Sequence, residues 1–155
     1  MAAHRLLTVG KPRDPCLASW VDEYIKRIRG WANWTWESIA EESFATHDQH
    51  RALIKEDQAL GRRIRSADWV VLMSISGQML DSRGLSQKLN EWYDQGRTLC
   101  VVVGGSLGVG PEVEQRANWK WSLSPLTLPH ALAQVVTMEQ IYRAAAIANG
   151  HAYHK

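Results

Sequence analysis

Short apolar runs alternate with amphipathic stretches along almost the whole chain, and this alternation restricts the possible folds more than any other feature. Strands separated by helices cannot pair as hairpins, so they favour a parallel sheet with helices on both faces. The sequence therefore predicts a three-layer α/β fold with a mostly parallel sheet, in one domain over residues 1–155. The expected strands are residues 5–9, 34–36, 69–75, 99–103 and 119–123.

The stretches between these runs carry apolar residues at helical spacing. Asp14 and Pro15 provide an N-cap and a first-turn proline for the first helix, and Gly96 follows the third helix as a C-terminal stop. The second helix is charged, and its expected buried stripe is Leu53, Ile54, Leu60 and Ile64. The expected helices are residues 15–29, 48–66, 86–95, a short one from 111, and 130–148.

Composition is that of a soluble globular protein, with 45% hydrophobic and 22% charged residues. No secretory signal or membrane-length apolar run is present, so we expect a cytoplasmic protein without a membrane partner. Two cysteines make no disulfide framework, and no ligand cluster predicts a metal. With a net charge of only +2, we expect one subunit to be unable to hold RNA by electrostatics alone.

Three loops follow expected strands and are candidates for ligand binding, because ligands of parallel sheets lie beyond the carboxyl ends of the strands. They cover residues 74–80, 104–110 and 124–129. The second loop has four glycines in seven residues, which favours backbone contact with a ligand over a simple turn. The third mixes hydroxyls and leucines between two prolines, and it fits an adenine site and a rigid helix cap equally well.

Gly104-Gly105-Ser106-Leu107-Gly108 matches the nucleophile elbow of serine hydrolases. A serine esterase is therefore one alternative, with Ser106 as its nucleophile. No aspartate follows Asp94, so the acid of a triad would have to be a glutamate on the adjoining helix. The glycine spacing also lacks the G-x-G-x-x-G pattern of dinucleotide binding.

Several blocks together make the chain similar to a bacterial family of large-subunit ribosomal RNA methyltransferases, which modify N3 of a pseudouridine and are minimal SPOUT methyltransferases. The resemblance covers essentially the full length. The blocks are Leu7-Thr8-Val9-Gly10-Lys11, Val103-Gly104-Gly105-Ser106 with Gly108, Ser122-Leu123-Ser124, Leu126-Thr127-Leu128-Pro129-His130, Glu139-Gln140-Ile141-Tyr142-Arg143-Ala144 and Tyr153-His154-Lys155.

The resemblance implies a C-terminal trefoil knot that binds S-adenosylmethionine in a bent conformation, and a 23S rRNA stem-loop in the assembled ribosome as substrate. The family's residues map here to cofactor-binding Met73, Gly104, Gly105, Leu123, Ser124, Pro125, Leu126, Thr127 and Leu128. They also map to RNA-binding His130, Arg143, Tyr153, His154 and Lys155. As the base that removes the N3 proton, His154 is the first candidate and Glu139 the second.

Family members act as homodimers in which the tail of one subunit approaches the methyl donor of the other. The chain departs from the family at Leu107, where an acidic residue or Asn is usual, and at Gln134, where a basic residue is common. By resemblance, the second change removes a candidate RNA contact. A non-catalytic ribosome-binding module is the other alternative function.

Overall fold

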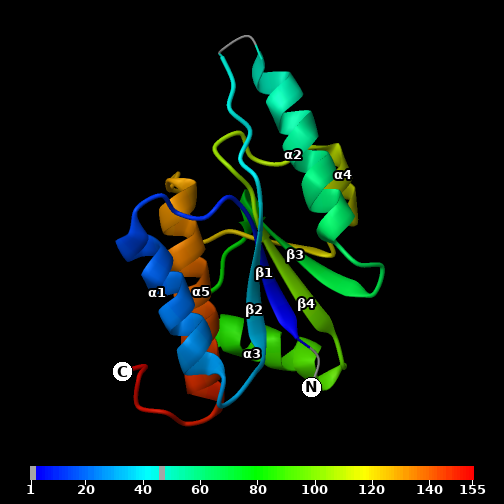
Figure 1. Cartoon of the computed structure of the whole chain (residues 1–155). Helices are drawn as coiled ribbons and strands as arrows, with labels where there is room; N and C mark the ends of the chain where they lie inside the picture. The colour runs from blue at the N-terminus through cyan, green and yellow to red at the C-terminus, as the bar shows by residue number, and fades with distance from the viewer. Residues whose placement is uncertain (1–2, 46–47) are drawn as a thin grey trace.

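The computed structural model describes residues 3–45 and 48–155 and contains a five-stranded sheet between two layers of helices (Figure 1). The strand order is β2-β1-β4-β3-β5, and every pairing is parallel. The elements are β1 (His4–Val9), α1 (Pro15–Ile28), β2 (Trp34–Ile39), α2 (Gln49–Arg63), β3 (Asp68–Gln78), α3 (Ser82–Asp94), β4 (Thr98–Val103), α4 (Pro111–Arg116), β5 (Trp119–Trp121) and α5 (His130–Ala148).

Helices α1, α3 and α5 pack together on one face of the sheet, and α2 packs with α4 on the other. Side chains of β4 alternate between the two cores: Val101 and Val103 join the first, whereas Cys100 and Val102 join the second. The predicted three-layer, parallel arrangement is confirmed. The trefoil knot implied by the resemblance stays a prediction.

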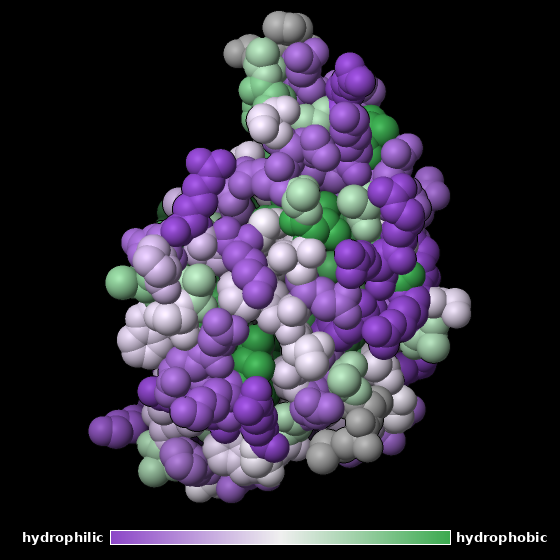
Figure 2. Space-filling model, viewed as in Figure 1, coloured by the Kyte–Doolittle hydropathy of each residue, from purple (hydrophilic) through white to green (hydrophobic). Residues whose placement is uncertain are grey.

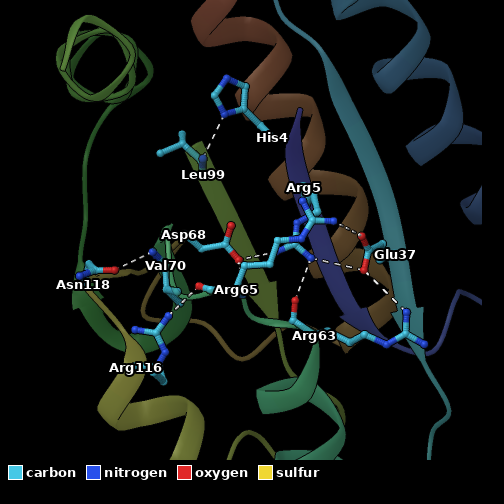
Figure 3. Close-up of polar contacts among 10 residues, drawn as sticks. All are labelled: His4, Arg5, Glu37, Arg63, Arg65, Asp68, Val70, Leu99, Arg116 and Asn118. Carbon is cyan, nitrogen blue, oxygen red and sulfur yellow. Dashed lines mark hydrogen bonds and ion pairs between the residues drawn. The ribbon is translucent and has the colours of Figure 1, made fainter. Parts of the chain in front are cut away.

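A buried ion pair connects the amino ends of β1 and β3 across β4 (Figure 3). The Arg5 guanidinium contacts the Asp68 carboxylate, and both side chains are 2% exposed. Arg5 also donates to the main-chain oxygen of Arg63 at 3.0 Å and to Glu37 at 3.3 Å, so β2 and the end of α2 join the same network. These charges hold the sheet at the end opposite its carboxyl edge.

Strand β3 is longer than the sequence predicts, because it continues beyond Ile75 to Gln78. Met73 and Gln78 both pair with Trp121, so the residues between them form an irregularity in the ladder. A side chain at Gly77 would lie 2.6 Å from the main chain of β5, so only glycine permits this approach. The expected loop at residues 74–80 is therefore mostly an irregular strand.

Helix α3 begins at Ser82, four residues before the predicted start at residue 86. The Asp81 carboxylate accepts a hydrogen bond from the Gly84 amide at 2.7 Å, which is the geometry of an N-cap. The sequence contains this N-cap signal, an aspartate followed by a serine. The spacing of the apolar residues, however, predicted a later start for the helix. The other helices begin within one residue of their predicted starts.

Candidate functional site

A cavity of about 870 Å³ lies at the carboxyl edge of the sheet, where the irregular end of β3 meets the segments after β4 and β5. All three predicted ligand loops contribute to its wall, together with the start of α5. The sequence-predicted cofactor residues that line it are Met73, Gly104, Gly105, Leu123, Ser124, Leu126, Thr127 and Leu128. Pro125 is the one predicted residue outside the lining.

The glycine loop, residues 104–110, folds back on itself as a tight hairpin. Gly105 and Gly108 form an antiparallel bridge, and Gly108 has a positive φ of 80°. A side chain at Gly104 would meet the Gly108 carbonyl oxygen at 2.8 Å. Contacts within the protein thus already require glycine here. The number of glycines in this loop is therefore weaker evidence for a bound ligand than it is in the sequence alone.

Helix α2 holds the far end of the glycine loop through Asp57, which sequence reasoning did not identify. The two oxygens of its buried carboxylate accept hydrogen bonds from the Glu112 and Val113 amides, each at 3.0 Å. These amides belong to the first turn of α4, which has no side-chain cap of its own. A side chain at Gly110 would lie 2.5 Å from Asp57, so loop and carboxylate fit only with glycine.

The neighbouring Glu56 lies beneath the near end of the same loop. Its Oε2 accepts from the Glu42 amide at 2.9 Å. Its buried Oε1 has no hydrogen-bond partner among the residues that the structure describes and lies 3.3 Å from where a Gly105 side chain would begin. Burial raises the pKa of this carboxyl above its usual value. Glu56 and Asp57 are two acidic residues on the inward face of an otherwise amphipathic helix, and this was the sequence signal that could have identified them.

The loop after β5 is held by its own serines. Ser122 donates to the Ser124 carbonyl oxygen at 3.1 Å, and the Ser124 hydroxyl accepts from the Leu126 amide at 3.0 Å. The Leu126 side chain is 73% exposed at the rim of the cavity. The leucines of this loop therefore face the cavity, while its serine hydroxyls hold the loop in its conformation. This is the division of roles expected of an adenine site.

Ser106 lines the cavity but makes no hydrogen bond to a histidine within residues 3–45 and 48–155. A serine nucleophile needs an adjacent base, and His130, the histidine of that wall, instead lies 4.0 Å from Glu41. The structure gives no support to the serine esterase alternative.

A second polar group joins α5 to the C-terminal tail. The Glu139 Oε1 accepts from Arg143 Nε at 3.0 Å, from Arg143 Nη2 at 2.8 Å and from the Tyr153 hydroxyl at 2.9 Å. Its Oε2 accepts from Gln140 at 2.7 Å. Arg143 Nη1 lies 3.2 Å from His154 Nδ1, and the guanidinium lies over the Tyr153 ring. Burial, then hydrogen bonding, raises the Tyr153 pKa.

This tail cluster (Glu139, Arg143, Tyr153, His154) does not line the cavity of its own chain. His130 at the start of α5 does line it, and Glu139 follows nine residues later, about 13 Å along the helix axis. Figure 1 shows the C-terminus at the opposite end of α5 from its first turn. The predicted catalytic and cofactor residues are therefore separate within one chain.

Two positions where the sequence departs from the family pattern have different surroundings. Gln134 is fully buried and donates to the Gly10 carbonyl oxygen at 3.2 Å, so the expectation that this position is a lost RNA contact is wrong. Its environment is the interior between α5 and the end of β1. Leu107 lines the cavity and makes that part of its wall apolar.

Within the described part of the chain, no three His, Cys, Asp or Glu side chains are grouped so that they could hold a metal ion. No helix in residues 3–45 and 48–155 has the length and apolar character needed to cross a membrane.

Comparisons with known proteins agree on one family. Residues 2–154 match the family model described as predicted SPOUT methyltransferase. Proteins named ribosomal RNA large subunit methyltransferase H are similar over 97% of both chains, at 38% identity in Psychrobacter arcticus and 37% in Stenotrophomonas maltophilia.

Solved structures share the fold at low sequence identity. A probable methyltransferase from Bordetella pertussis has a TM-score of 0.57 at 12% identity, covering 93% of this chain and 94% of that one. A probable rRNA-methyltransferase from Porphyromonas gingivalis has a TM-score of 0.56 at 11% identity, covering 95% and 70%.

Proposed function

Since this chain belongs to the SPOUT methyltransferase family, we propose that it methylates large-subunit ribosomal RNA, with S-adenosylmethionine as the methyl donor and N3 of a pseudouridine as the acceptor. Its relatives are named for methylation of large-subunit rRNA and match nearly its full length. The donor and the acceptor atom are the finer parts of the proposal and rest on the resemblance described above.

The observation that carries the proposal is the meeting of three separate strand-end segments around one cavity. Its volume is in the range of pockets that enclose a nucleoside-sized ligand. Leu123, Leu126 and Leu128 provide apolar surface for a flat ring, and the backbone of Gly104 and Gly105 offers amides and carbonyls for its polar edge. These residues fit an adenosyl group.

When bound, S-adenosylmethionine supplies a methyl group that its sulfonium already activates. The protein then has to align the acceptor nitrogen with that methyl and exclude water. Residues of the cavity wall orient the donor, whereas His130, at the first turn of α5, lies on the wall where an RNA base would enter.

We propose that a second copy of the chain completes the site with its C-terminal tail. Within one chain the tail cluster lies away from the cavity, so a tail acting in chemistry must reach another subunit. Leu132 and Val136, one turn apart on α5, are 41% and 36% exposed, and Trp20 on α1 is 46% exposed. These apolar side chains are the surface that a homodimer would cover.

The contacts of the tail cluster favour different roles for the two candidate bases. Both Glu139 oxygens are occupied by donors, so this carboxylate fits the positioning of Arg143 and Tyr153 better than proton removal. His154 keeps Nε2 outside the contact with Arg143, so it stays the first candidate for contact with the acceptor base. Arg143 and Lys155 suit phosphates or the base edge.

Transfer of tritium from labelled S-adenosylmethionine to large ribosomal subunits tests this function directly. We expect incorporation into rRNA, with calorimetric binding of S-adenosylhomocysteine and no esterase activity. Methyl transfer should persist in Ser106→Ala, which the esterase alternative does not allow. A protein that binds ribosomes but transfers no label would instead be the non-catalytic module.

We also propose that the substrate is the assembled ribosome. The family resemblance supports this, and recognition of an accessible loop base favours a structured target. Transfer of the labelled methyl group should be much faster to ribosomes or large subunits than to protein-free rRNA fragments. Equal rates on the two substrates would contradict this part of the proposal.

A further inference from the structure

Basic side chains gather along the outer face of α2. Arg51, Lys55 and Arg62 are exposed, and together with the exposed Gln58 they make what we call the α2 basic stripe (Arg51, Lys55, Gln58, Arg62). At 100° per residue, these four positions fall within about 60° around the helix axis. Figure 2 shows mainly hydrophilic residues over α2.

The acidic residues of the same helix point inward. Glu56 and Asp57 are each only 3% exposed, and their carboxylates accept from main-chain amides beneath the glycine loop and at the start of α4. Helical spacing places this pair about opposite the stripe. The outer face of α2 thus presents cations without anions from its own helix.

Neighbouring elements leave most of this charge unpaired. Leaving Asp48 aside, no ion pair joins Arg51, Lys55 or Arg62 to an acidic side chain among residues 3–45 and 49–155. By contrast, Arg63 and Arg65 lie 3.8 and 3.9 Å from Glu37 at the end of the helix (Figure 3).

Negative charge approaches α2 near both ends of the stripe. Glu42 and Asp48 border a small hollow together with Arg51 and Lys55, and the Glu112 carboxylate lies against Gly61. The stripe spans about 16 Å from Arg51 to Arg62, a length over which one nucleic-acid strand presents several phosphates.

The stripe also lies close to the cavity. The inner side of α2 contacts the glycine loop, since Glu56 lies beneath Gly105. A helix with its side chains is about 10–12 Å wide, so the outer face is one helix diameter from that loop. A strand that lies along α2 therefore runs beside the cavity.

We propose that the α2 basic stripe binds the sugar–phosphate backbone of ribosomal RNA and forms a second contact beside the cavity that receives the target base. This inference rests on the proposed function, because it takes RNA as the substrate. Its physical basis is charge complementarity with phosphates, which contributes affinity without reading sequence. The net charge of +2 is a sum over the whole chain, whereas the stripe gathers three exposed cations on one face of one helix.

A triple variant, Arg51→Gln, Lys55→Gln and Arg62→Gln, tests the stripe. Its matched control is Lys26→Gln, Arg29→Gln and Arg83→Gln, which removes the same charge from exposed positions outside α2. Glutamine forms helices well, so both variants should keep the thermal midpoint of the parent.

We expect the stripe variant to raise KM for large ribosomal subunits on the order of tenfold, with kcat and S-adenosylhomocysteine affinity unchanged. The slope of log affinity against log salt should fall by about 2 to 3, as expected for three lost phosphate contacts. The control variant should change both quantities by much less.

Three results would overturn the inference. One is an unchanged KM in the stripe variant, and another is an equal rise in the control. The third is weaker binding to assembled subunits with unchanged binding to protein-free rRNA, which would assign the stripe to a ribosomal protein. If the parent itself neither binds S-adenosylhomocysteine nor transfers methyl groups, the proposed function fails instead.

Discussion

At the scale of single residues, a few buried carboxylates set the shape of the cavity wall. Asp57 holds the first turn of α4, and Glu56 lies under Gly105, so both ends of the glycine loop depend on one turn of α2. Neither residue touches the cavity, and their effect on any ligand acts through the loop. They are positioning residues for the methyl-donor site that we propose.

Replacing Asp57 by alanine should loosen that loop. The Glu112 and Val113 amides would lose their acceptors, so we expect a loss of about 1–3 kcal/mol in the free energy of unfolding. Calorimetry should also show weaker binding of S-adenosylhomocysteine at a temperature where the variant is folded. Asp94→Ala, at the exposed end of α3, is the control and should change neither property. Lower stability with parental binding would restrict Asp57 to a role in folding.

At the scale of elements, the sheet is held at its amino edge by buried polar contacts and left open at its carboxyl edge. Arg5 and Asp68 connect β1 with β3, and His4 connects β1 with β4 by accepting from the Leu99 amide at 3.0 Å. Because these contacts lie away from the cavity, the strand-end loops can be specialised for binding while the opposite edge provides rigidity.

The His4 contact predicts a dependence of stability on pH. Burial lowers the pKa of His4 from 6.5 to about 4, so this residue stabilises the fold above pH 6.5 and loses that contribution as the pH falls toward 4. Between pH 7 and pH 4 the free energy of unfolding should fall by up to about 3 kcal/mol more in the parent than in His4→Asn.

Urea unfolding at several pH values measures this difference. His50→Asn is the control, because His50 is exposed on α2 and should leave the pH profile of the parent unchanged. Parallel profiles for the parent and His4→Asn would show that the buried imidazole does not govern acid stability.

At the scale of the whole molecule, one chain places its cavity and its tail cluster at different ends of α5. A homodimer resolves this separation if each tail serves the cavity of the other subunit. Removing residues 153–155 should then abolish methyl transfer and leave S-adenosylhomocysteine binding nearly intact. Equal loss of both would contradict this division of roles.

Mixed dimers distinguish a tail that acts on the partner from one that acts on its own chain. Gly104→Val should disable the cavity, because a side chain there meets the Gly108 carbonyl. Co-expression with the tail-deleted chain gives half mixed dimers, each with one complete site, so about a quarter of parental activity should return. A tail acting within its own chain restores none.

Much of this architecture follows from local patterns. The alternation of apolar runs and amphipathic stretches predicts the parallel sheet and its helical layers, because burial on both faces requires that composition. Because ligands of parallel sheets lie beyond the carboxyl ends of the strands, residues 74–80, 104–110 and 124–129 were predicted to come together. All three segments contribute to one cavity, the first of them from within β3. Local signals were less reliable where tertiary packing decides, as in the extension of β3 past Gly77 against β5.

The sequence by itself thus determined the layers, the parallel strands and the candidate binding loops, since each depends on the spacing of neighbouring residues. Tertiary structure decided which charges are used internally and which face solvent: Glu56 and Asp57 point inward, Gln134 is buried, and Arg51, Lys55 and Arg62 are exposed. It also separated His154 from the cavity. Burial and distance between remote segments arise only when the whole chain packs, so no local pattern contains them.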